Sequence, residues 1–456
     1  MKKLNATKSN TTAKEVRNVI VGFGKTGVSV AEHCQRQGML FAVADDAVRP
    51  ARLKEFDAPN KPITFASLEK FVFEKNDRLV VSPGVPLSHS VLQDAVKSGL
   101  KLTSDIKIFC QLRQKPLALI TGSNGKSTVT HIVGQLLNAV NIKTGVGGNI
   151  GTPALDLFKG DFSAYAIEVS SYQLELADAA TADVAVLLNL SPDHLDRYAA
   201  LADYYQAKTQ VFTGCGTAIY CRDLDFPLGI STQTKVITFG TDAPADSLSY
   251  GIRETNGKYY LARGENDLVG VDELPIKGRH NWLNLLAAIA IAEAMGAELE
   301  SLLQVLPSIS GLPHRCEVIH SNIGLVVNDS KSTNPSSTLT AIEGFSDANV
   351  EMTLILGGIG KGADFSVLGE AIQTRVTRCY VYGQDREQIV EQVGSPMVKF
   401  ETLEECLLDL SKRSFSISPM SKPLILFSPA CASLDQFENF EARGDYFKKR
   451  ATELFE

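Results

Sequence analysis

The sequence of 456 residues lacks the patterns typical of membrane, zinc-binding, disulfide-stabilised and nucleic-acid-binding proteins. No apolar run approaches the roughly 20 residues of a membrane-spanning helix. The eight cysteines show no Cys-x-x-Cys spacing, which indicates reduced thiols rather than a zinc site or a disulfide framework. The net charge of −7 argues against nucleic-acid binding, because such proteins usually carry a basic face. The remaining class is an ordinary soluble globular protein.

The N-terminal stretch also lacks a feature, the apolar core of a signal peptide. Residues 1–15 are polar and rich in lysine, so we expect a disordered tail there and a cytoplasmic protein. There is no internal repeat, and the chain length predicts about three domains. We expect a monomer without a nucleic-acid or membrane partner.

The most informative stretch is residues 121–128, Thr-Gly-Ser-Asn-Gly-Lys-Ser-Thr, which lies between an apolar run and a helical pattern. A strand, a glycine loop, Lys-Ser and a helix form the arrangement that binds a nucleoside triphosphate. Lys126 would reach the β- and γ-phosphates, and the Ser127 hydroxyl would hold Mg²⁺. A strict phosphate loop has glycine at the position that Ile120 occupies here, so this motif is a shortened variant. The alternative is a glycine-rich turn with a surface lysine.

A second glycine motif, Gly-x-G-x-x-Gly at residues 22–27, lies between predicted strands at 16–21 and 39–44. Asp45 and Asp46 end the second strand, which completes the dinucleotide-fold fingerprint. The motif indicates NAD, another ligand with a pyrophosphate, or a glycine turn without a ligand. A further strand at 78–81 ends at a loop with Ser82 and Gly84, and such strand ends bind ligands in open α/β sheets. This first domain spans 16–112.

The predicted second domain, 113–311, carries polar residues near strand ends beside the phosphate loop. Glu168 lies in a strand at 164–169, where an unpaired buried carboxylate is costly, so we predict a functional role. A strand at 183–190 ends near Asp193 and His194, which suit Mg²⁺ or water. Asp193 also fits a helix cap. Lys208, on a helix at 199–212, fits a solvated lysine when judged from its neighbours alone.

Three other stretches of this domain carry predictions. Residues 145–151 are so rich in glycine that we expect a loop over a ligand. Residues 214–275 alternate short strands and turns, which predicts a β-rich insertion. Asn281 and Asn284 share one face of a helix and suit the edge of a base, although helix capping by Asn281 is the alternative.

The third domain, 312–456, is predicted to be α/β. Its strands are expected at 325–328, 352–356, 376–382 and 424–427, and loops at 329–334, 357–364 and 428–433 follow three of them. Their lysines and hydroxyls suit an anionic amino acid or a phosphate, and ordinary surface loops are the alternative. Cys431 has no histidine paired with it in the sequence, so we do not predict a nucleophile.

Six motifs together resemble those of the Mur ligase family over essentially the whole chain. They are residues 122–128, 148–151, 168–171, 193–197, 278–281 and 312–315. Residues 328–334 and 428–437 are similar to the branch that adds D-glutamate to UDP-N-acetylmuramoyl-L-alanine. The Asn-Pro-Arg motif of the branch that adds diaminopimelate or lysine is absent.

The resemblance implies an α/β fold with three domains, namely a Rossmann-like domain, a central phosphate-loop domain and a second Rossmann-like domain. It implies an ATP-dependent amide ligase of peptidoglycan precursor synthesis. ATP would convert the substrate carboxylate to an acyl phosphate, and the amine of D-glutamate would displace the phosphate. Mg²⁺, Lys126 and the loop amides would screen the negative charges. Because three ligands must meet, domain closure is expected.

The resemblance also implies site residues. The catalytic group is Lys126, Glu168, His194 and Lys208. ATP would be bound by Gly122, Asn124, Gly125, Lys126, Ser127, Thr128, Asn281, Asn284, Arg315 and Asp329. The UDP-sugar, in place of NAD, would be bound by Thr26, Asp45, Asp46, Ser82, Gly84 and Asn149. D-Glutamate would be bound by Lys331, Thr333, Lys361, Ser433 and Phe440. Two Mg²⁺ ions would be held by Ser127, Glu168, His194 and Lys208, the last as a carbamate.

Two alternatives remain open. A sibling ligase, such as a folylpolyglutamate synthase or another muramyl ligase, would use a different amino-acid acceptor. An NAD-dependent oxidoreductase with an incidental phosphate loop would reduce nicotinamide and release no phosphate.

Overall fold

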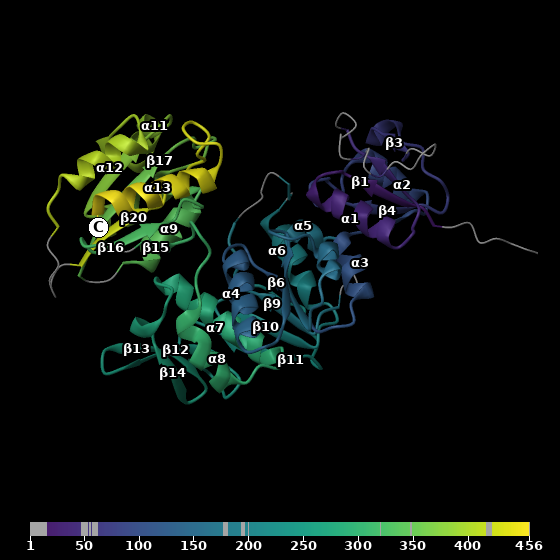
Figure 1. The fold of residues 1–456 in the computed structure, drawn as a ribbon, viewed down its shortest axis with the longest axis horizontal. Helices are drawn as coiled ribbons and strands as arrows, with labels where there is room; N and C mark the ends of the chain where they lie inside the picture. Colours follow the sequence, from purple (N-terminus) through teal and green to yellow (C-terminus); the bar gives the residue numbers. More distant parts are fainter. Residues whose placement is uncertain are drawn as a thin grey trace, which may run out of the picture.

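Three sheets, each covered by helices, organise the chain into three lobes, and the central lobe lies between the other two (Figure 1). The computed structural model describes residues 16–46, 53, 56, 63–176, 181–192, 197–198, 200–319, 321–346, 349–415 and 422–455. The expected tail at 1–15 and the residues Asp193 and His194 lie outside these ranges.

The first sheet is parallel, with the strand order β3-β2-β1-β4-β5. Its strands are β1 (Asn18–Val21), β2 (Phe41–Ala44), β3 (Phe65–Ala66), β4 (Arg78–Val81) and β5 (Lys101–Thr103). Its helices are α1 (Lys25–Arg36), α2 (Ser90–Lys97) and α3 (Asp105–Leu112). The buried strand residues form apolar runs, as expected for parallel strands that are covered on both faces. This is the Rossmann-like arrangement that the glycine motif predicts.

The central sheet has nine strands in the order β14-β13-β12-β11-β10-β9-β6-β8-β7. The parallel part is β6 (Leu117–Thr121), β7 (Thr144–Gly148), β8 (Ala164–Glu168), β9 (Val184–Leu187), β10 (Thr217–Cys221) and β11 (Lys235–Phe239). The antiparallel part is β12 (Tyr250–Thr255), β13 (Lys258–Arg263) and β14 (Asn266–Gly270). The helices are α4 (Lys126–Ala139), α5 (Ser171–Leu174), α6 (Leu201–Thr209), α7 (Arg279–Ala294) and α8 (Leu299–Val305).

One sequence-based prediction for the central lobe needs correction, and another is confirmed. The glycine-rich stretch 145–151 is not wholly a loop, because its first half forms the edge strand β7. The glycines allow close packing: a Cβ on Gly147 would lie 2.2 Å from the carbonyl oxygen of Thr152, and one on Gly148 would lie 2.1 Å from that of Glu168. The stretch 214–275 is rich in short strands, as predicted, and these strands extend the central sheet, because β10 pairs with β9.

The third sheet has the order β15-β16-β20-β17-β18-β19. Its strands are β15 (Glu317–Ile319), β16 (Leu325–Asn328), β17 (Val350–Gly357), β18 (Arg378–Tyr382), β19 (Val398–Lys399) and β20 (Lys422–Phe427). Its helices are α9 (Pro335–Gly344), α10 (Gly369–Arg375), α11 (Arg386–Val393), α12 (Leu403–Ser411) and α13 (Phe440–Phe455). All pairs are parallel except that of β15 with β16. Strands β15 and β19, of three and two residues, were not predicted from the sequence.

Side chains join the lobes. Phe109 of α3 stacks on Phe158 of the central lobe, with ring centres 4.6 Å apart, and the Lys25 ammonium donates to the Gly151 carbonyl oxygen at 2.6 Å. On the other side, helices α7 and α9 pack together. There the rings of His280 and Phe345 lie 6.0 Å apart. The central sheet therefore has a neighbour at each flank.

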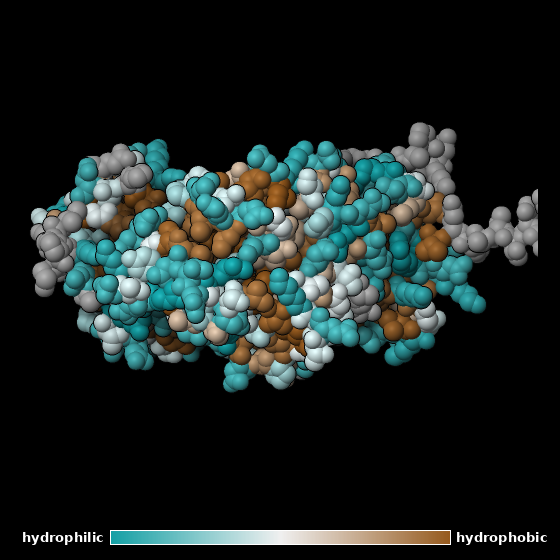
Figure 2. All heavy atoms as spheres, turned by 90° about the horizontal axis from the view of Figure 1, so that it is seen from below, coloured by the Kyte–Doolittle hydropathy of each residue, from teal (hydrophilic) through white to brown (hydrophobic). Residues whose placement is uncertain are grey.

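The surface is mixed in polarity. Figure 2 shows one face on which hydrophobic residues form separate patches among hydrophilic ones. Among the described residues, no helix combines the length and the apolar composition that crossing a membrane requires.

Candidate active site

The phosphate loop joins β6 to the N-terminus of α4, as the motif predicts. Gly125 caps the helix with φ +81°, a left-handed conformation that glycine adopts without strain. The Lys126 ammonium donates to the carbonyl oxygens of Gly122 and Ser123, both at 2.9 Å. Ile120 is fully buried in β6, so the position where a strict motif has glycine belongs to the strand core.

Residues far away in sequence hold this loop, and no local sequence pattern predicted them. Asn189, after β9, accepts a hydrogen bond from the Asn124 amide at 2.8 Å and donates to the Asn124 carbonyl at 3.0 Å. The Ser123 hydroxyl accepts from the Ser191 amide and lies 3.0 Å from the Tyr204 hydroxyl. The loop is therefore held by Asn189, from the segment after β9, and by Tyr204 of α6.

Lys208 does not lie on a solvated helix face, as its neighbours in sequence suggested. Its side chain is buried, and its amine donates to the Gly122 carbonyl oxygen at 2.7 Å. The amine also lies 4.8 Å from the centre of the Tyr204 ring. Lys208 and Lys126 thus share one carbonyl oxygen of the phosphate loop.

Glu168 ends strand β8, next to the phosphate-loop strand β6. Its carboxylate is buried and accepts a hydrogen bond from the Asn149 side-chain amide at 3.1 Å. The Asn149 backbone amide donates to the Glu168 carbonyl oxygen at 2.9 Å. The buried carboxylate therefore has a partner from the glycine-rich segment. His194, predicted as a second metal ligand, lies outside the described residues.

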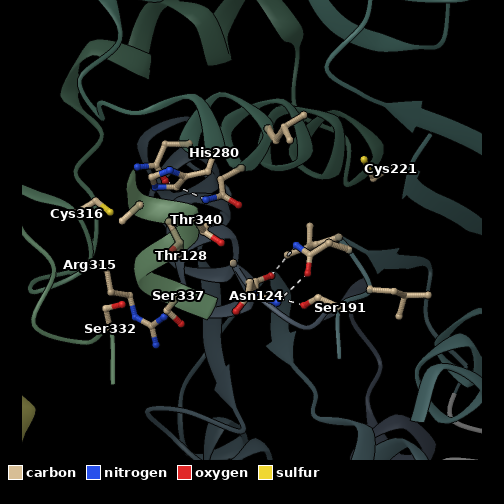
Figure 3. Close-up of a pocket in the computed structure, with 18 of the residues that line it drawn as sticks. Asn124, Thr128, Ser191, Cys221, His280, Arg315, Cys316, Ser332, Ser337 and Thr340 are labelled. Atoms are coloured by element: carbon tan, nitrogen blue, oxygen red, sulfur yellow. Dashed lines mark hydrogen bonds between the residues drawn. The ribbon is translucent and has the colours of Figure 1, made fainter. Parts of the chain in front are cut away.

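A cavity of about 430 Å³ lies between the phosphate loop and the third lobe (Figure 3). In Figure 3, Asn124 and Ser191 lie on one side and Arg315 and Ser332 on the other. Seven of the residues predicted to bind ATP line this cavity: Asn124, Gly125, Thr128, Asn281, Asn284, Arg315 and Asp329. Its apolar lining includes Leu188, Leu283 and Phe239. A cavity with an apolar wall and convergent polar groups is typical of a small-molecule or cofactor site.

Arg315 and Asp329 bring charge to this cavity. The Arg315 guanidinium donates to the Ser127 hydroxyl at 3.4 Å, which links the third lobe to the phosphate loop. Burial lowers the pKa of Arg315, while Glu168 and Asp329 act against that shift. Burial raises the pKa of Asp329 to about 6, although Ser428 donates to its carboxylate at 2.8 Å. The site is therefore a preformed, partly desolvated charge cluster.

Asn281 and Asn284 lie on one face of α7, as predicted. Asn281 does not cap the helix, because Gly278 is the N-cap residue and Asn281 lies inside. The Asn281 side-chain amide donates to the Lys277 backbone carbonyl at 2.8 Å. The Asn284 side-chain amide donates to the Oδ1 atom of Asn281 at 2.9 Å. The two amides are thus held in fixed orientations at the cavity wall.

His280 also lines the cavity, and only the resemblance motif at 278–281 had pointed to this residue. Its Nδ1 atom is buried and has no hydrogen-bond partner among the described residues. Burial lowers the pKa of His280 to about 4. A Cβ on Gly344 would lie 2.2 Å from this Nδ1 atom, so the α7–α9 contact depends on that glycine.

The residues predicted to bind D-glutamate come together only in part. The Lys331 ammonium lies 4.3 Å from the centre of the Phe440 ring and lines the same cavity, and burial lowers its pKa. Ser433 is buried, whereas Lys361 is exposed. Their two loops are joined by paired backbone hydrogen bonds between Ile359 and Ala432, both at 2.9 Å.

Thr333 is half-buried in the loop that follows Lys331. Cys431 is fully buried, and burial raises the pKa of its thiol to about 12. This agrees with the prediction that Cys431 is no nucleophile.

The first sheet gathers polar residues at the carboxyl ends of its strands. Asp45 accepts from the Phe23 amide at 2.5 Å, and Asp46 accepts from the Leu68 amide at 2.9 Å. The Ser82 hydroxyl donates to the Gly22 carbonyl oxygen at 2.8 Å. Thr26 lies at the start of α1, and a Cβ on Gly84 would meet nothing within 4 Å. The predicted residues of this lobe therefore share one edge of the sheet.

Comparison with protein families gives three matches along the chain. The Mur ligase MurD-like N-terminal domain matches residues 16–104, the Mur ligase middle domain matches 120–292, and the Mur ligase glutamate ligase domain matches 314–414. The order of the matches follows the order of the three sheets.

Curated relatives match nearly the whole chain. A UDP-N-acetylmuramoylalanine–D-glutamate ligase of Hahella chejuensis is 40% identical over 443 residues, which cover 95% of this chain and 97% of the relative. The enzyme of the same name from Pseudomonas syringae pv. tomato is 39% identical, with 94% and 96% covered.

Solved structures share the fold at low sequence identity. The MurF ligase of Thermotoga maritima in complex with ADP aligns with a TM-score of 0.59 and 18% identity, covering 96% of each chain. The UDP-N-acetylmuramate-alanine ligase of Thermotoga maritima aligns with a TM-score of 0.55 and 16% identity, covering 96% of this chain and 100% of the other. Together the matches favour the ligase hypothesis over the oxidoreductase hypothesis.

Proposed function

The chain belongs to the Mur ligase family, and on that premise we infer that it is an ATP-dependent ligase that joins D-glutamate to UDP-N-acetylmuramoyl-L-alanine in peptidoglycan synthesis. The observation that carries this inference beyond the family likeness is the cavity between the phosphate loop and Arg315. It offers a nucleotide both a phosphate-binding loop and a polar wall from a second lobe.

We propose that this cavity binds ATP with its phosphates at the loop. The backbone amides at the N-terminus of α4 and the Lys126 ammonium would bind the β- and γ-phosphates. The fixed amides of Asn281 and Asn284, with Arg315 and Asp329, would contact the nucleoside part. The proposed ATP set is completed by Gly122, Asn124, Gly125, Ser127 and Thr128.

The proposed reaction has two steps. A carboxylate oxygen of the L-alanyl group attacks the γ-phosphorus, ADP leaves, and an acyl phosphate forms. The amine nitrogen of D-glutamate then attacks the acyl carbon, loses a proton, and inorganic phosphate leaves with that carboxylate oxygen. Lys126 lowers the repulsion between two anions in the first step. The three lobes supply the alignment that both steps need.

Magnesium is the metal that this chemistry implies, and the described residues offer it few ligands. These residues contain no group of three or more His, Cys, Asp or Glu that could hold a metal ion. The Ser127 hydroxyl and the buried Glu168 carboxylate fit Mg²⁺, which usually takes one or two protein ligands together with water and phosphate oxygens. Bound Mg²⁺ would neutralise developing phosphate charge. We propose two such ions, with His194 as a further ligand.

We propose that Lys208 is carbamylated and so becomes a metal-binding carboxylate. Its buried amine beside the Gly122 carbonyl supports this role, because a carboxylate on that nitrogen would lie next to the phosphate loop. A buried lysine on the active-site side of α6 also needs a reason beyond solubility.

The other two ligands are assigned to the flanking lobes. We propose that the UDP-sugar binds at the edge of the first sheet through Thr26, Asp45, Asp46, Ser82 and Gly84, with Asn149 from the central lobe. We propose that D-glutamate binds through Lys331, Thr333, Lys361, Ser433 and Phe440. The corresponding domains are 16–112, 113–311 and 312–456, in a monomer that acts in the cytoplasm, where ATP and UDP-sugars are available.

A phosphate-release assay tests the function. We expect release from ATP only with UDP-N-acetylmuramoyl-L-alanine and D-glutamate together, and none with L-glutamate, L-lysine or diaminopimelate. Turnover with another acceptor would assign the chain to a sibling activity and contradict the proposal.

The carbamate has its own test. Lys208→Ala should lose activity that bicarbonate does not restore and that short carboxylic acids restore in part. Unchanged activity would remove Lys208 from the site.

A further inference from the structure

One arginine links the first sheet to the central lobe close to the phosphate loop. The Arg197 guanidinium donates through Nη1 to the Pro83 carbonyl oxygen and through Nη2 to the Glu175 carboxylate, both at 2.9 Å. It also lies 3.9 Å from the centre of the Tyr172 ring. The side chains of Arg197 and Glu175 are only 15% and 17% exposed, so this ion pair is largely shielded from solvent.

The carbonyl that Arg197 contacts belongs to the loop after β4. Pro83 lies between Ser82 and Gly84, which are assigned to the UDP-sugar under the proposed function. Within the first lobe this loop is held by the Ser82 amide, which donates to the Val21 carbonyl, and by the Val85 amide, which donates to the Ser82 carbonyl. Arg197 adds a side-chain contact from the central lobe.

On the other side, the contacts continue to the phosphate loop. Glu175 also accepts a hydrogen bond from the Tyr198 hydroxyl at 2.5 Å. The Tyr198 ring lies 5.4 Å from the ring of Tyr204, whose hydroxyl lies 3.0 Å from that of Ser123. Side chains in contact therefore run from the loop at 82–85 to the loop that holds Lys126.

We propose that Arg197 is a positioning residue, which holds the loop at 82–85 in place relative to the phosphate loop through Glu175 and Tyr198. The proposal rests on the proposed function, because the reaction needs the substrate carboxylate and the γ-phosphate to meet. An arginine suits this role better than a lysine. Its planar fork donates to a carbonyl and a carboxylate at once and stacks on the Tyr172 ring, whereas an ammonium group is a compact point charge.

The test replaces the fork but keeps the charge, in Arg197→Lys. The matched control is Arg253→Lys in the β12–β13 hairpin, where Arg253 likewise donates to a carbonyl oxygen, that of Gly264, and to a carboxylate, that of Asp267. Glu175→Gln serves as a second variant that removes the ion pair and keeps an acceptor for Tyr198.

Two readouts are measured on the full chain. The first is amide hydrogen exchange of Gly84 and Val85 in the free protein, which we expect to rise about tenfold in Arg197→Lys because the loop loses its outside contact. The second is calorimetric binding. The dissociation constant for UDP-N-acetylmuramoyl-L-alanine should rise about tenfold, and that for ATP should stay within about twofold, as for a loss near 1.4 kcal/mol at one ligand only. Arg253→Lys should change neither readout.

The outcomes separate the two proposals. Unchanged exchange in both Arg197→Lys and Glu175→Gln overturns the role of Arg197, as does an equal weakening of both ligands. A wild-type protein that does not bind UDP-N-acetylmuramoyl-L-alanine contradicts the proposed function instead, and the exchange rates still decide whether Arg197 holds the loop.

Discussion

The proposed nucleotide cavity and the edge of the first sheet both lie where parallel strands end, but their polar side chains have different hydrogen-bond partners. At the cavity, side chains reach across lobes, as Arg315 does to Ser127. At the first sheet, Asp45 and Asp46 bond to backbone amides within the lobe. The cavity is thus a buried cluster of charged groups. The first sheet instead presents backbone loops whose conformation is held by hydrogen bonds to Asp45 and Asp46. Substitutions at the cavity should therefore act mainly by changing its charge, and substitutions at the first sheet mainly by changing the conformation of its loops.

The largest expected effect is at the phosphate loop. Lys126→Ala removes the cation that lies against the Gly122 and Ser123 carbonyls, and the rate of phosphate release should fall about a thousandfold. Steady-state kinetics measures it. The control is Lys143→Ala, which removes a lysine that lies over the Phe162 ring, away from the loop. Equal rates for the two variants would contradict the assignment of the cavity.

Two buried carboxyl groups, one at the cavity and one on α3 of the first lobe, should make the stability of the protein depend on pH. Burial raises the pKa of Asp329, at the cavity, and of Asp105, on α3, each to about 6. Because each carboxyl binds its proton more tightly in the folded than in the unfolded chain, folding is favoured at low pH. That advantage is lost as the pH rises from about 4 to about 6, and it amounts to at most about 3 kcal/mol per group.

Urea unfolding at several pH values checks this expectation. Asp105→Asn and Asp329→Asn should each flatten the decline in the free energy of unfolding between pH 4 and pH 6. If a variant and the wild-type protein give parallel curves, that carboxyl does not have a raised pKa.

The next largest effect is expected for Arg315, which links the cavity to the phosphate loop. Arg315→Lys keeps the charge at the cavity but loses the fork that reaches Ser127, so the KM for ATP should rise about 30-fold, which corresponds to about 2 kcal/mol. The KM for the UDP-sugar substrate should change little. A rise in the second KM alone would show that the cavity does not bind ATP.

The smallest effect is expected at the first sheet. Asp45→Ala leaves the Phe23 amide without its acceptor, and the loosened turn should weaken binding of the UDP-sugar substrate about tenfold while ATP binding is unchanged. Calorimetric titration measures both. Asp46→Ala, which frees the Leu68 amide farther along the edge, is the matched variant and should have a weaker effect. A larger loss for Asp46→Ala would reverse the roles of the two acids.

Local patterns predicted much of this architecture. The strand at 78–81 and the helix after the phosphate loop follow from apolar runs and glycine punctuation, and both are observed. The glycine-rich strand β7 could not be predicted that way, because its glycines are required by close contacts with Thr152 and Glu168, which form only in the folded lobe. Strand β15 has only three residues and forms by pairing with β16.

The site residues were likewise predictable where a local pattern marked them. Lys126 was found because it follows a glycine loop between a strand and a helix, and Glu168 because it is a carboxylate in an apolar strand. The residues that hold the loop, Asn189 and Tyr204, were missed because their contacts join positions 65 and 81 residues apart. Such contacts exist only once the lobe has folded, and no local pattern marks them.

The central claim is that ATP at the cavity and the UDP-sugar at the first sheet meet in one acyl-phosphate reaction. The most direct measurement uses UDP-N-acetylmuramoyl-L-alanine with ¹⁸O in its terminal carboxylate, together with ATP and D-glutamate, and determines the mass of the released phosphate. The account predicts that each phosphate carries one ¹⁸O atom from the carboxylate. Phosphate without the label, released while the amide forms, would contradict it.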